Sequence, residues 1–99
     1  MPDPGLQIAI IGGGIAGLAT AFNLEGMAKE SDTPLGVTLF EQSSQVGGNL
    51  RTVENKGFIV EEGPNGFLDN EPATLRLVEK LGLGPELQRS EDAPRIRFL

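Results

Sequence analysis

The chain has 99 residues and a formal net charge of −6, which allows one small domain and argues against a nucleic-acid partner, since phosphate-binding surfaces need clustered Lys and Arg. It contains no cysteine, which excludes disulfides and thiolate metal sites. It contains no histidine either, which removes the commonest general base and metal ligand, so we expect no metal site and expect a cofactor to carry any catalysis.

No apolar stretch reaches the ~18 residues of a membrane span, so we expect no transmembrane segment. The first residues, MPDPGLQ, are acidic and lack the basic region of a secretory signal. We therefore expect a cytoplasmic protein. Peripheral contact with the inner membrane would have to come from regions outside this chain.

The first expected elements are a strand over Leu6–Ile11 and a helix from Ile15 to about Lys29. The strand is rich in β-branched residues and shows no alternation, which predicts a parallel strand buried on both faces. Between them stand Gly12, Gly14 and Gly17, in the G-x-G-x-x-G spacing of a dinucleotide-binding turn. Ile15, Leu18, Ala19 and Phe22 are expected to form the apolar face of the helix.

A second short strand is expected over Val37–Glu41, which completes one βαβ unit with parallel, adjacent strands. Glu41 follows Gly17 at close to the ~20-residue spacing of the acidic residue that binds the adenosine ribose. A carboxylate accepts ribose hydroxyls and repels a 2′-phosphate. Glu41 therefore favours FAD or NAD over NADP.

The remaining chain predicts an added hairpin and a second helix. The hairpin is expected over Leu50–Val53 and Phe58–Glu61, joined by Asn-Lys-Gly, and is followed by a loop around Gly63, Pro64 and Gly66. The helix is expected over Glu71–Gly82, with Leu75, Val78 and either Leu77 or Leu81 on its apolar side. Leu83–Arg89 is expected to add one helical turn, and Arg95–Leu99 to begin a strand.

The fold class expected from these elements is α/β: a partial, Rossmann-like βαβ unit over residues 1–99 with an added β-hairpin. One long and one short helix cannot cover both faces of a buried parallel sheet. We therefore expect the chain to be an N-terminal fragment of a larger enzyme, or a chain that self-associates to cover its sheet.

A second glycine pair, Gly47-Gly48, follows Glu41 closely, and here the chain resembles the flavoprotein amine-oxidase and porphyrinogen-oxidase superfamily, whose motif runs from a strand through Glu to Gly-Gly-Arg. Asn49 stands where Arg is usual, and Ser43 where a basic residue is frequent. Both departures remove positive charge near the cofactor. The glycine pair favours FAD over NAD.

Two later segments resemble protoporphyrinogen and coproporphyrinogen oxidases in particular. Glu61–Phe67, reading EEGPNGF, is similar to the family's E-x-G-P-N-S-F segment, which implies that Gly63, Pro64 and Asn65 lie by the flavin ring. Ala93-Pro94-Arg95 is similar to the family's A-P-R segment, which implies that Arg95 meets a propionate of the substrate. A surface turn and a solvated strand arginine are the alternative interpretations of these segments.

The resemblance implies a flavin-dependent oxidase of heme biosynthesis. Such an enzyme passes hydride from a porphyrinogen to FAD and then electrons to O2. The residues expected to bind FAD are Gly12, Gly13, Gly14, Ile15, Ala16, Gly17, Glu41, Gln42, Gly47, Gly48, Asn49, Gly63, Pro64 and Asn65. No residue stands out as a catalytic acid or base. The alternatives are another flavin amine oxidase or desaturase, and a nucleotide-binding fragment with no activity of its own.

Overall fold

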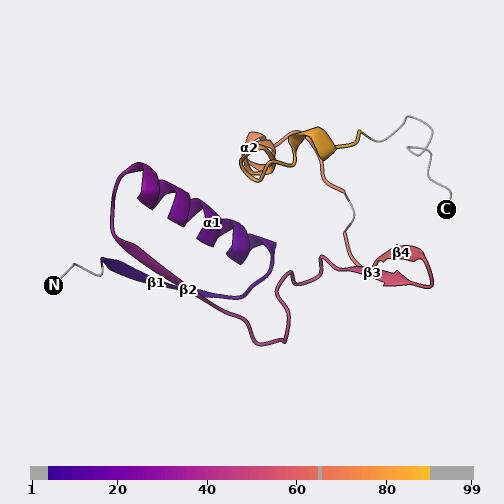
Figure 1. Ribbon diagram of the computed structural model, residues 1–99, viewed down its shortest axis with the longest axis horizontal. Helices are drawn as coiled ribbons and strands as arrows, with labels where there is room; N and C mark the ends of the chain where they lie inside the picture. Colours follow the sequence, from indigo (N-terminus) through magenta and orange to yellow (C-terminus); the bar gives the residue numbers. More distant parts are fainter. Residues whose placement is uncertain (1–4, 65, 90–99) are drawn as a thin grey trace. The chain divides into compact units, whose positions relative to one another are not determined.

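The computed structural model describes residues 5–64 and 66–89, which fall into two compact units divided after Phe67. The first unit begins with β1 (Leu6–Ile11), α1 (Ile15–Glu30) and β2 (Leu35–Phe40) (Figure 1). β1 and β2 pair in parallel, with a register running from Leu6↔Leu35 to Ile11↔Phe40. The α/β class and the βαβ unit are therefore confirmed. β2 lies earlier than predicted, so that Glu41 directly follows the strand.

α1 packs along one face of this two-stranded sheet (Figure 1). The half-buried positions of α1 include Gly17, Ala21, Leu24 and Ala28, spaced as one face of a helix. The predicted apolar face is wrong in part, since Leu18 and Ala19 are half-buried but Ile15 and Phe22 are 57% and 39% exposed. Small residues line the contact because they let the helix approach the strands closely.

The expectation of a strand buried on both faces is wrong for this chain. Ile8 and Ile10 are half-buried on the side of α1, whereas their neighbour Ile11 is 82% exposed. Ile11 pairs with Phe40, which is also more than half exposed. Among the described residues no hydrophobic side chain is fully buried. The alternation arises because α1 covers one face of the sheet and leaves the other open.

The hairpin consists of β3 (Thr52–Asn55) and β4 (Phe58–Glu61), which pair antiparallel (Figure 1). The predicted first strand, Leu50–Val53, is displaced by two residues. The reason lies in the turn, where Lys56 and Gly57 have φ values of 52° and 81°. Positive φ at both central residues is the geometry of a two-residue type I′ turn, and it sets the register of the strands on either side.

In the second unit, α2 (Pro72–Lys80) is followed by the short 3₁₀ helix η1 (Gly84–Glu86). The Glu71 carboxylate caps α2 by accepting a hydrogen bond from the Ala73 amide at 3.3 Å. Leu75, Leu77 and Val78 are half-buried. The predicted helix was one or two residues too long at each end, and the predicted extra turn is η1.

The expected strand over residues 95–99 lies outside the described residues, as do Asn65 and Arg95. Within the described part of the chain, no helix has the length and apolar character needed to cross a bilayer.

Candidate nucleotide-binding site

The glycine turn joins β1 directly to α1. The Gly12 amide donates a hydrogen bond to the Phe40 carbonyl at 2.7 Å, which carries the parallel strand pairing into the turn. Gly12 has a φ of 105°, a conformation that favours glycine. Gly14 is the N-cap of α1 and provides no side-chain cap, so the first-turn amides of Ile15, Ala16 and Gly17 point out of an uncapped helix end.

Three glycines of the turn meet different steric demands. A Cβ at Gly17 would overlap the Gly12 carbonyl oxygen, so only glycine lets the helix return this close to the strand. Gly13 is buried, and a Cβ there would lie 3.0 Å from Val46 Cγ1 and 3.1 Å from Leu39 Cδ2. A Cβ at Gly14 would meet nothing within 4 Å. The turn is therefore tightly packed at Gly13 and Gly17, whereas the space next to Gly14 is open.

Glu41 reaches back from the end of β2 to this turn. Its Oε1 accepts a hydrogen bond from the Gly13 amide at 2.9 Å. Its Oε2 accepts from the Ser43 amide and from the Ser43 hydroxyl, each at 2.8 Å. These bonds, led by those from the Ser43 and Gly13 amides, lower the pKa of Glu41 below its ordinary value because they stabilise the charged carboxylate. Glu41 is thus an oriented anion beside the glycine turn.

The second glycine pair also lies against the turn. The Gly47 amide donates to the Gly13 carbonyl at 2.7 Å, and Gly47 and Gly48 both have positive φ. A Cβ on Gly48 would lie 3.3 Å from Gly14 Cα. The structure therefore brings Gly47-Gly48 and the first glycine turn together through the backbone.

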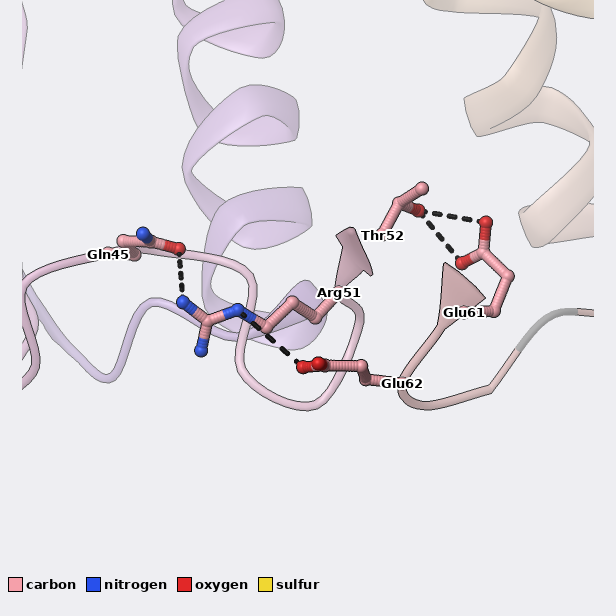
Figure 2. Close-up of polar contacts among 5 residues, drawn as sticks. All are labelled: Gln45, Arg51, Thr52, Glu61 and Glu62. Atoms are coloured by element: carbon pink, nitrogen blue, oxygen red, sulfur yellow. Dashed lines mark hydrogen bonds and ion pairs between the residues drawn. The ribbon is translucent and has the colours of Figure 1, made fainter. Parts of the chain in front are cut away.

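Arg51 was not predicted from the sequence as part of this site. It connects the loop that carries Gly47 and Gly48, called here the second loop, to the end of the hairpin. Its guanidinium donates a hydrogen bond to Gln45 Oε1 at 3.0 Å, and its Nε lies 3.9 Å from a Glu62 carboxylate oxygen. Figure 2 shows both contacts. The Glu62 amide also donates to the Arg51 carbonyl at 2.8 Å. Next to it, Thr52 Oγ1 contacts both carboxylate oxygens of Glu61 across the hairpin (Figure 2).

This connection brings the beginning of the Gly63-Pro64 segment to the second loop. A Cβ on Gly63 would overlap the Asn49 carbonyl oxygen, so these two backbones are in close contact. Gln42 and Pro64 are exposed beside these segments. In the sequence, Arg51 and Glu62 have opposite charges, but opposite charge by itself does not specify a pairing.

The matching family is described as flavin containing amine oxidoreductase, and the match covers residues 15–99. The chain belongs to this family. Membership agrees with the coarse expectation of a flavin cofactor and an oxidoreductase.

Within the family, the chain is 47% identical over 83 residues to coproporphyrinogen III oxidase of Bacillus subtilis. This match covers 84% of this chain and 18% of the relative. A crystal structure of a protein assigned as a protoporphyrinogen oxidase from Exiguobacterium sp. 255-15 matches with a TM-score of 0.70 and 34% identity, over 81% of this chain and 17% of that one.

A putrescine oxidase variant made in a redesign of cofactor binding matches with a TM-score of 0.61 and 32% identity, over 80% of this chain and 17% of the other. The chain therefore spans less than a fifth of the length of each of these relatives. The βαβ unit therefore shares its fold with these flavin oxidases. The resemblance to porphyrinogen oxidases that the sequence motifs indicated is confirmed.

Proposed function

We propose that this chain is the FAD-binding segment of a flavin-dependent oxidase that converts a porphyrinogen to a porphyrin in heme biosynthesis. The observation that carries the proposal is the convergence of the Glu41 carboxylate and the Gly47-Gly48 backbone on the first glycine turn. Residues 1–99 would form part of one FAD-binding domain. The family supports a flavin, and the carboxylate beside the turn supports the adenine dinucleotide form.

The described residues fit this cofactor. The first-turn amides of α1 are uncapped, and the space above Gly14 is open, so a pyrophosphate has both donors and room. A side chain at Gly14 would occupy that room. Glu41 would accept the ribose hydroxyls, and Gly47, Gly48 and Asn49 would form a second backbone wall.

Bound FAD would supply the hydride acceptor for the oxidation, and O2 is proposed as the final electron acceptor. Gly63, Pro64 and Asn65 would lie by the flavin ring, supported by the Gly63 contact with Asn49. Arg95 would bind a propionate of the substrate, for which a planar guanidinium is well suited. These residues would bind and orient the cofactor and the substrate, and none is assigned a proton transfer.

The likeness to a putrescine oxidase keeps an amine substrate as the second candidate. The GPN and APR segments favour a porphyrinogen over an amine. A third candidate is a nucleotide-binding chain without activity, for which FAD binding without oxidation of either substrate is expected.

The test is the protein expressed from its complete gene and purified. We expect flavin absorbance, release of FAD rather than FMN on denaturation, and oxygen-dependent appearance of porphyrin fluorescence from coproporphyrinogen or protoporphyrinogen. Turnover of putrescine without porphyrin formation would overturn the substrate assignment. A protein that neither contains nor binds FAD would overturn the cofactor assignment.

A further inference from the structure

The Glu41 carboxylate is nearly saturated by groups of its own chain. A carboxylate has about four acceptor positions on its two oxygens. Ser43 fills both positions on Oε2, through its amide and its hydroxyl at 2.8 Å each, and the Gly13 amide fills one on Oε1 at 2.9 Å. One position remains, whereas an unmodified ribose offers two hydroxyl donors.

The Ser43 hydroxyl has a second acceptor within reach. Its Oγ lies 2.7 Å from the Gln45 carbonyl oxygen as well as 2.8 Å from Glu41 Oε2. A serine hydroxyl carries one hydrogen and can serve one acceptor at a time. Rotation about the Cβ–Oγ bond therefore transfers this hydrogen bond from Glu41 to Gln45 without any movement of the backbone.

We propose that Ser43 is a positioning residue for the ribose diol. Its hydroxyl would hold Glu41 Oε2 in place in the free protein and turn to the Gln45 carbonyl when a second ribose hydroxyl donates to Oε2. Each oxygen of Glu41 then has one amide donor and one ribose donor, and every polar group keeps a partner. This inference rests on the proposed FAD site.

The pKa of Glu41 is lowered by hydrogen bonds, mainly from Ser43 and Gly13 and to a smaller extent from the Gln42 backbone. Among the described residues, the ion pairs made by Arg51 and Arg89 go to Glu62 and Asp69, and neither includes Glu41. The Ser43 hydroxyl is one of the groups that lower the pKa of Glu41, after the amides of Ser43 and Gly13. Removing it therefore raises this pKa in the free protein.

The matched control is in the same loop. Ser44 is exposed and forms no side-chain hydrogen bond within the described chain. Ser44→Ala therefore changes the loop chemistry in the same way as Ser43→Ala without touching Glu41. Ser43→Thr retains the hydroxyl and is the conservative rescue.

The experiment measures the Kd for FAD of the apoprotein, made from the complete gene, by quenching of flavin fluorescence from pH 7 to pH 3.5. We expect Ser43→Ala to weaken binding about 3-fold at pH 7, because the hydroxyl no longer holds Glu41 Oε2 in place before FAD binds. The difference from wild type should widen only below the ordinary pKa of a glutamate, where the free variant is protonated first. Ser43→Thr and Ser44→Ala should follow the wild-type curve.

A Ser43→Ala curve equal to wild type at every pH would overturn the role of Ser43 while leaving the FAD site intact. So would a loss that is constant with pH and unrescued by Thr, since that indicates only a damaged loop. Failure of the wild-type apoprotein to bind FAD at any pH would instead overturn the proposed function itself.

Discussion

At the scale of single residues, Gly17 provides the most local test of the turn. A Cβ at this position overlaps the Gly12 carbonyl oxygen, so Gly17→Ala must push α1 away from β1. We expect Gly17→Ala to lower the free energy of unfolding by about 1–3 kcal/mol, the usual cost of overpacking. Urea denaturation followed by circular dichroism measures the change.

Gly26 is the control in the same helix. A Cβ there would meet nothing within 4 Å, so Gly26→Ala should stabilise α1 by up to about 1 kcal/mol through helix propensity alone. Equal effects of the two substitutions would contradict the close approach of α1 to the glycine turn.

The protonation of Glu41 gives a prediction about pH. Hydrogen bonds from Ser43 and Gly13 lower its pKa in the folded state, so the carboxylate stabilises the fold above its ordinary pKa. This contribution is lost as the pH falls through the lowered folded-state pKa. Glu41→Gln should therefore be less stable than wild type at pH 7, and the difference should shrink on acidification.

The measurement is urea denaturation of both proteins at a series of pH values from 7 down to 3. Glu61→Gln is the comparison, because its carboxylate contacts Thr52 in the hairpin and lies outside the glycine turn. A stability difference for Glu41→Gln that is independent of pH would be inconsistent with an ionised, hydrogen-bonded Glu41.

At the scale of elements, the hairpin depends on the turn between β3 and β4. Lys56 is a non-glycine residue at φ 52°, followed by Gly57 at φ 81°. Asn tolerates this conformation better than Lys, and Asn-Gly is the preferred type I′ pair. We expect Lys56→Asn to stabilise the hairpin by up to about 1 kcal/mol, and Lys56→Val to destabilise it by a similar amount.

Amide hydrogen exchange in β3 and β4 measures this effect directly, since slower exchange reports a more stable hairpin. Faster exchange in Lys56→Asn than in wild type would show that the turn is not type I′. The turn also explains why the predicted strand over Leu50–Val53 was displaced. Apolar residues alone indicated a strand, but the turn conformation decided which residues pair.

At the scale of the whole chain, the open face of the β1–β2 sheet determines behaviour in solution. Ile11 and Phe40 are cross-strand partners on this face and are 82% and 54% exposed. Contiguous exposed apolar residues favour association. We expect the isolated 99-residue chain to bind a hydrophobic dye and to self-associate with rising concentration, as size-exclusion chromatography with light scattering would detect.

The double substitution Ile11→Thr with Phe40→Thr should reduce both signals, because threonine has a high strand propensity but removes the large apolar groups. The matched control, Leu6→Thr, changes another exposed apolar side chain on the face of α1. A wild-type chain that stays monomeric and dye-free at high concentration would contradict this role of the open face.

The sequence by itself determined the order and type of the elements and the residues of the glycine turn. These features depend on local chemistry: β-branched runs, helical spacing, and glycine at positions with positive φ or close backbone approach. The motifs that resemble porphyrinogen oxidases could also be identified from the sequence alone, because each is a contiguous segment. Asn65 and Arg95 remain predictions outside the described residues.

Only the tertiary structure decided which faces are covered and which groups pair across the chain. Burial of β1 on one face, the exposure of Ile15 and Phe22, and the Arg51 contacts all depend on segments distant in sequence. The hydrogen bonds from Gly13 and Ser43 to Glu41 are of the same kind. Local patterns cannot specify such pairings, because they arise only when the parallel register places the end of β2 beside the turn after β1.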